Sequence, residues 1–263
     1  MKPYEVLLND NKHWAAKKLA EDPDFFERLL HVQSPEFLWI CCSDSRVPPD
    51  QITQTEPGEI FIHRNVANLV VNTDVNLMSV VDYAVNHLKI KHVVVCGHYG
   101  CGGIKAAMSN EDFNQVLNMW LRNIKDIYRI HRKELENITD EEKRVNRMVE
   151  LNVKEQVFNL AKTALIQRAW SSEQRPDLHG WVYDLHDGLI KPIVEMKAGT
   201  DIDPLYEFED LSYLLSCEIN TVAKDKSLPL PGNPVMPASL FFSYTRKTQS
   251  SPIPLLQLRQ RIQ

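Results

Sequence analysis

The chain has 263 residues, a formal net charge of −5 and a hydrophobic fraction of 43%. That fraction is sufficient for a substantial core, in one large domain or in one domain with an appendage. The absence of a basic excess argues against a nucleic-acid partner, and apolar runs such as residues 92–97 are far too short to span a bilayer. The N-terminal segment has no apolar signal-peptide region, so we expect a cytoplasmic protein.

The first third of the chain alternates helical and strand-like patterns. Residues 5–30 read as a helix, and the apolar run 36–41 suits a short buried strand. That strand stops at the polar segment 42–46 (CSDSR), just before two prolines that exclude regular structure. A second apolar run, 60–62, ends in the polar segment 63–65 (HRN).

The same alternation continues through the middle of the chain. Apolar residues recur at i, i+3 and i+4 over residues 74–89, which predicts a helix with Asp74 as its N-terminal cap. Residues 93–96 suit another buried strand, which ends in the glycine-rich turn 97–103 (GHYGCGG). Two further helical stretches and a last strand are predicted at residues 113–134, 141–172 and 180–183.

Strands that alternate with helices predict an α/β fold, with a mainly parallel sheet flanked by helices and a long N-terminal helical arm. Ligand sites of such sheets gather at the carboxyl ends of the strands. Because segments 42–46 and 97–103 both follow strands, we expect them to converge.

The end of the chain has a different composition. Residues 228–263 hold six of the 15 prolines and four basic residues, but no Asp or Glu. This composition favours an extended or disordered tail, or one that wraps around a partner.

The odd number of cysteines, five, in a long chain without an apolar N-terminal segment argues against a disulfide framework. Cys41 and Cys96 lie inside apolar strands and are expected to pack as core residues. Cys217 has no neighbours of the kind that bind metals, and we assign it no role.

Cys42, His98 and Cys101 are the candidate metal ligands. Thiolate sulfur and imidazole nitrogen suit zinc, and a catalytic zinc keeps a fourth position for water or substrate. Glycines around His98 and Cys101 let the backbone bend at the metal. Spacing alone leaves open the alternative of an ordinary loop histidine and a small buried thiol.

Asp44 and Arg46 follow Cys42 by two and four residues. A carboxylate there can take the fourth metal position, or it can pair with the guanidinium and leave that position open. The alternative is an ordinary surface ion pair.

Three segments, 42–46, 63–68 and 97–103, together resemble the signature segments of the β-class carbonic anhydrases, and the likeness extends from about residue 5 to about residue 200. The resemblance implies one zinc ion per chain, bound by Cys42, His98 and Cys101, and a catalytic pair formed by Asp44 and Arg46. It also implies reversible hydration of CO2 to bicarbonate by a zinc-bound hydroxide, whose pKa lies near neutrality. The proton shuttle is not identified.

The resemblance also implies a substrate pocket and an assembly. Gln33 and Tyr83 match residues that line the CO2 pocket, often across a dimer interface, although Tyr83 equally suits packing in its helix. A homodimer or homotetramer is expected. The carbonic anhydrase domain would cover residues 1–220, near which relatives usually end, and the extension 221–263 does not map onto the family.

One bacterial subset of the family, called type II, is inhibited by bicarbonate. Trp39, Arg64 and Tyr183 match its regulatory bicarbonate site, at which the anion favours a closed state with Asp44 on the zinc. The alternative for Trp39 is a core aromatic residue. Cys41 replaces the glycine of many relatives in this subset, so the regulatory pocket is expected to be altered.

Two competing functions remain. One is a bicarbonate or zinc sensor without activity, which the intact ligands and the Asp44–Arg46 pair argue against. The other is hydration or hydrolysis of another small linear molecule, such as carbon disulfide, because the fold does not settle the substrate.

Overall fold

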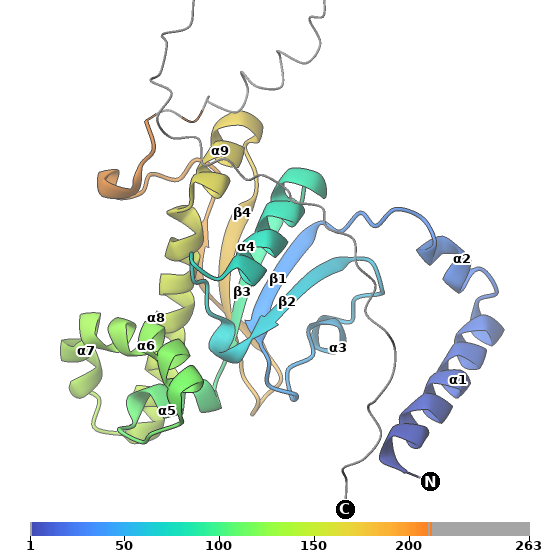
Figure 1. The fold of residues 1–263 in the computed structure, drawn as a ribbon, viewed down its shortest axis with the longest axis horizontal. Helices are drawn as coiled ribbons and strands as arrows, with labels where there is room; N and C mark the ends of the chain where they lie inside the picture. The colour runs from blue at the N-terminus through green and yellow to red at the C-terminus, as the bar shows by residue number, and fades with distance from the viewer. Residues whose placement is uncertain (1, 210, 212–263) are drawn as a thin grey trace, which may run out of the picture. The chain divides into compact units, whose positions relative to one another are not determined.

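The computed structural model describes residues 2–209 and 211, and in this part of the chain a five-stranded sheet is covered by helices (Figure 1). The strands are β1 (Phe37–Cys42), β2 (Ile60–Asn65), β3 (His92–His98), β4 (Asp177–Tyr183) and β5 (Ile190–Met196). Their order is β2-β1-β3-β4-β5, and all neighbours pair in parallel except β4 and β5. The predicted fold class, with a mainly parallel sheet, is therefore confirmed.

The helices largely follow the predicted stretches but divide them. The α-helices of the described residues are α1 (Pro3–Glu21), α2 (Phe25–Leu29), α3 (Pro49–Thr53), α4 (Val75–Asp82), α5 (Gly102–Met108), α6 (Gln115–Ile130), α7 (Arg132–Glu136), α8 (Glu141–Ala161) and α9 (Ala164–Glu173). The short turns are η1 (Val66–Asn68), the π-turn η2 (Tyr83–His87) and η3 (Pro204–Tyr206).

Some predicted boundaries were wrong, for local reasons. The helix predicted over 5–30 breaks between α1 and α2, where Pro23 lacks the N–H that a continuous helix needs. The turn predicted over 97–103 is shorter, because α5 already begins at Gly102. Strand β5 was missed, since Pro192 and charged residues interrupt its apolar run. Asp74 does cap α4, accepting hydrogen bonds from the N–H groups of Asn76 and Leu77.

The two faces of β1 pack differently, because side chains alternate along a strand. Leu38 and Ile40 point into the main core, which α4, α8 and α9 cover. Trp39 and Cys41 point to the other face and pack with Val94 and Cys96 of β3 in a smaller cluster. Cys41 and Cys96 are buried core residues, as predicted.

Parallel pairing brings the carboxyl ends of β1 and β3 together. Cys41 lies opposite Cys96, so the next residue of β1, Cys42, ends beside the last residues of β3. The two signature segments that follow these strands therefore start from neighbouring points at one edge of the sheet. This edge holds the candidate site.

The C-terminal extension predicted for residues 221–263, the domain boundary at 220 and Cys217 lie outside the described residues. Within residues 2–209, none of the helices is both long enough and apolar enough to cross a bilayer.

Candidate metal centre

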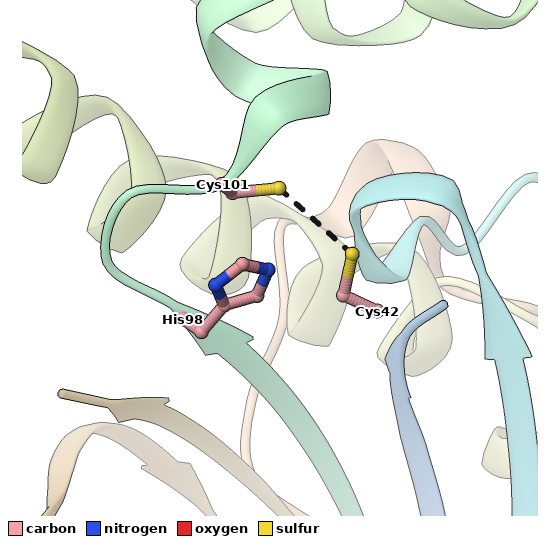
Figure 2. Close-up of side chains that lie close together, drawn as sticks. All are labelled: Cys42, His98 and Cys101. Atoms are coloured by element: carbon pink, nitrogen blue, oxygen red, sulfur yellow. Dashed lines mark hydrogen bonds between the residues drawn. The ribbon is translucent and has the colours of Figure 1, made fainter. Parts of the chain in front are cut away.

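Three side chains from two strand ends and one helix start point toward a common centre (Figure 2). Cys42 is the last residue of β1, His98 is the last residue of β3, and Cys101 is the N-cap residue of α5. Their exposed fractions are 6%, 1% and 2%. The sequence prediction that these three residues converge is confirmed.

The ring of His98 is oriented for metal binding. Its Nδ1 lies 3.1 Å from the backbone oxygen of Tyr99, to which it donates a hydrogen bond as the protonated nitrogen. Its Nε2 is buried and has no hydrogen-bond partner among the described residues. Buried polar atoms without a partner are rare, and a metal ion facing this nitrogen would supply the missing partner.

The donor set and its spacing fit zinc. Two sulfurs that are each about 2.3 Å from a tetrahedral ion lie about 3.8 Å apart. The sulfur atoms of Cys42 and Cys101 are 3.9 Å apart. Two thiolates and one imidazole leave the fourth position open, as in catalytic zinc sites.

Cys42 and Cys101 share a proton. A hydrogen bond from Cys101 lowers the pKa of Cys42, against the opposing effect of burial, and His98 and the N–H of Ala67 add to the shift. The pKa of Cys101 is raised, because it shares its proton with Cys42 and is itself buried. A cation between the sulfurs would favour the ionised form of both thiols.

Asp44 lies beside this centre. Its carboxylate accepts two parallel hydrogen bonds from Arg46, with Nε–Oδ1 at 2.9 Å and Nη2–Oδ2 at 2.7 Å. The same carboxylate is 3.7 Å from Nε2 of His98. The guanidinium of Arg46 holds the pKa of Asp44 well below its usual range, so Asp44 is an anion next to the metal position.

Comparisons with known proteins agree with this geometry. Residues 37–190 match the family model for carbonic anhydrase. A carbonic anhydrase of Emericella nidulans is 50% identical over 190 residues, covering 72% of this chain and 83% of the relative. The chain belongs to the β-carbonic anhydrase family. Its members are enzymes that hydrate CO2, and this chain is accordingly a carbonic anhydrase.

Solved structures of the family share the fold. A tetrameric β-carbonic anhydrase of Sordaria macrospora has a TM-score of 0.72 and 41% identity, and covers 74% of this chain and 100% of that structure. A Coccomyxa β-carbonic anhydrase in complex with acetazolamide also has a TM-score of 0.72, with 38% identity, and covers 75% of this chain and 90% of that structure.

Asn65 is a supporting residue that the sequence reasoning did not assign a role. Its side-chain amide spans the turn after β2, donating to the backbone oxygen of Leu69 and accepting from the N–H of Leu69, both at 2.8 Å. The turn holds Ala67 in a left-handed conformation, φ 66°, and presents its N–H to Cys42. Asn65 and Ala67 belong to the signature segment 63–68. The contact of this turn with Cys42 is a structural reason for that sequence pattern.

Arg64 and Tyr183 lie at the carboxyl ends of β2 and β4, next to the metal centre, whereas Trp39 lies in the middle of β1. Trp39 and Tyr183 belong to the small cluster on one sheet face. Arg64 donates hydrogen bonds to the backbone oxygens of Cys42 at 3.0 Å and Asp44 at 2.5 Å. The guanidinium therefore braces the segment that carries both a metal ligand and the neighbouring carboxylate.

Gln33 and Tyr83 lie in other surroundings within one chain. Gln33 lines a cavity formed mainly by α1, α2 and the loop at Glu56–Gly58, and none of the three metal ligands lines it. Tyr83 is exposed and packs against Phe61 and His87.

Proposed function

We propose that this carbonic anhydrase hydrates CO2 with one zinc ion held by Cys42, His98 and Cys101. The observation that carries the proposal is the convergence of two buried thiols on a buried imidazole nitrogen that has no other partner in the described part of the chain. Zinc at this position would act as a Lewis acid and make hydroxide available near neutral pH.

The protein groups have defined tasks in this proposal. Asp44, kept ionised by Arg46, accepts a hydrogen bond from the attacking nucleophile and orients it toward CO2. Arg46 keeps the carboxylate off the metal, since both carboxylate oxygens are occupied by its guanidinium. Asn65 positions the turn that donates an N–H to Cys42.

Gln33 and Tyr83 would complete the CO2 pocket across an interface between two copies of the chain. Within one chain, Gln33 lines a cavity that none of the three metal ligands lines, and Tyr83 packs against Phe61. These positions support a contribution from one copy of the chain to the site of another. The Sordaria relative is tetrameric, and we propose a dimer or tetramer here. Sizing at micromolar concentration would contradict this part if it gave a monomer.

Regulation by bicarbonate is the second part of the proposal. The indole nitrogen of Trp39 is buried and has no hydrogen-bond partner within the described residues, and Arg64 of the neighbouring strand β2 braces the backbone of Asp44. An anion that draws Arg64 toward Trp39 and Tyr183 would release that brace. Asp44 would then be free to leave Arg46 and take the fourth zinc position.

The decisive experiment is stopped-flow CO2 hydration with zinc-quantified protein from about pH 6.5 to 9, which brackets the expected near-neutral pKa. Cys42→Ser should lose both zinc and activity. Cys96→Ala is the matched control, because Cys96 is similarly buried two residues before the end of β3 but lies outside the ligand set. Zinc at about one per chain without hydration activity would favour a sensor or another substrate.

A further inference from the structure

A second group of metal-binding side chains lies at the amino end of the strands, away from the candidate zinc centre. His92 begins β3, Asp177 begins β4 directly opposite it, and His179 follows two residues later on the same face of β4. One potential ligand atom of each residue lies within 4.8 Å of the other two. The carbonic anhydrase reaction uses none of these residues.

The two imidazoles are spaced as metal ligands are. His179 Nε2 and His92 Nδ1 are 3.2 Å apart. Two nitrogens about 2.05 Å from a tetrahedral zinc ion lie about 3.3 Å apart, so an ion fits between these atoms with little movement. The alternative is a hydrogen bond between two neutral rings, with one nitrogen protonated.

Packing keeps both rings in place. Phe37 stacks on His92 with ring centroids 5.1 Å apart, and Trp181 packs on His179 at 5.7 Å. The side chain of His179 is 14% exposed and that of Asp177 is 23% exposed, so the group is half-buried but open to ions. Burial lowers the pKa of His179, which favours the neutral ring that a metal requires.

Two carboxylates and one ammonium lie beside the imidazoles. Asp177 Oδ1 accepts the N–H of Ala198 at 2.9 Å, which fixes the carboxylate, and its Oδ2 is 3.1 Å from the ammonium of Lys197. Glu195 also pairs with Lys197 and lies 3.9 Å from His179 Nδ1. Metal-binding histidines usually direct their second nitrogen toward a carboxylate, and Glu195 is the carboxylate nearest to Nδ1 of His179, although 3.9 Å is too long for a hydrogen bond.

We propose that His92, Asp177 and His179 form a second metal site that binds a divalent first-row transition ion such as zinc or copper. Imidazole nitrogens suit these ions, and Asp177 adds charge. Lys197, a flexible and exposed side chain, occupies the place of the cation when the metal is absent and competes with it. The bound ion would tie the start of β3 to the start of β4.

The test is calorimetric titration of Zn²⁺ into the full chain, free of a histidine tag and already loaded with its first zinc. The native chain should bind one further equivalent. His92→Gln and His179→Gln should lose that equivalent, and Glu195→Gln should weaken it roughly 10-fold or more. Lys197→Met should tighten it, because the competing ammonium is removed. Cu²⁺ added to the zinc-loaded chain should give an electron paramagnetic resonance spectrum with coupling to two imidazole nitrogens.

His131→Gln is the matched control. His131 is a half-buried imidazole 3.2 Å from a carboxylate oxygen of Glu155. Among the described residues, it belongs to no cluster of three potential metal ligands. This variant should keep the second equivalent. The proposal is overturned if the native chain binds no further zinc, or if His179→Gln binds as much zinc as the native chain. It is also overturned if the native chain and Lys197→Met bind the second zinc with equal affinity. In those cases His92 and His179 form a hydrogen bond with each other and do not bind a metal ion.

Discussion

The side chains of Asp44 and Arg46 lie face to face, and each carboxylate oxygen accepts one guanidinium hydrogen bond, at 2.9 Å and 2.7 Å. This carboxylate is also 3.7 Å from Nε2 of His98, a nitrogen without a hydrogen-bond partner in residues 2–209. The carboxylate of Asp44 can therefore either stay paired with the guanidinium of Arg46 or move to the metal position. The first prediction follows from that placement.

Removal of the guanidinium should lower activity without removing zinc. Hydrogen bonds to charged groups contribute about 1.5–3 kcal/mol, so Arg46→Ala should reduce kcat/KM by about 10- to 100-fold. Arg46→Lys should be intermediate, because a lysine keeps the charge but cannot form two parallel bonds. The control is Arg122→Ala, at an exposed position on α6. Unchanged kcat/KM in Arg46→Ala would remove the pair from the mechanism.

The indole nitrogen of Trp39 should affect the inhibition of the enzyme by bicarbonate, but not the rate of CO2 hydration without added bicarbonate. Trp39→Phe removes the buried N–H while keeping an aromatic ring, so inhibition by bicarbonate should weaken. Trp181→Phe is a matched control, since Trp181 packs edge-on against Trp39 at 5.5 Å but lies outside the proposed site. Equal inhibition of the native and Trp39→Phe enzymes, measured as CO2 hydration against bicarbonate concentration, would contradict the regulatory site.

Gly180 leaves no room for a side chain between β4 and α8. A Cβ there would lie 2.6 Å from Val194 Cγ1 and 2.9 Å from Val153 Cγ1. Gly180→Ala should therefore lower stability by about 1–3 kcal/mol, seen as a lower thermal midpoint at matched protein and zinc concentrations. Gly102→Ala, where a Cβ meets no atom of the described part of the chain within 4 Å, should show no such loss. Equal midpoints for the two variants would mean that α8 moves aside at no cost.

Asp184 should contribute stability that depends on pH. The ammonium of Lys191, 2.7 Å away, lowers the pKa of Asp184 to about 2, with help from the N–H of His186. Because the folded pKa lies below the unfolded value of about 3.9, the contribution is complete above pH 4 and is lost as pH falls toward 2. Urea unfolding should thus show Asp184→Asn less stable than the native chain at pH 6, with a smaller difference near pH 3.

The matched control for this pH dependence is Asp187→Asn. Asp187 lies 4.0 Å from the same lysine, and its side chain is 45% exposed, against 12% for Asp184. Its substitution should change stability less at pH 6. A difference for Asp184→Asn that stays constant between pH 6 and pH 3 would show that the carboxylate charge is not what stabilises the fold.

The sequence alone predicted the fold class and the three residues of the candidate metal centre. Apolar strands followed by polar segments predict that Cys42 and His98 meet, because parallel strands place their carboxyl ends at one edge. The family signatures pointed to the pair Asp44 and Arg46. These features are readable because each depends on a short local segment and a general rule about sheets.

Tertiary structure alone decided the rest. Strand β5 and the group around His179 escaped prediction, because a run broken by Pro192 shows no clear period, and because His92 and Asp177 are brought together only by the register of β3 and β4. The turn that offers the N–H of Ala67 to Cys42 likewise depends on Asn65 closing a left-handed bend. Contacts between residues far apart in the chain are set by packing and register, and a linear sequence does not display either.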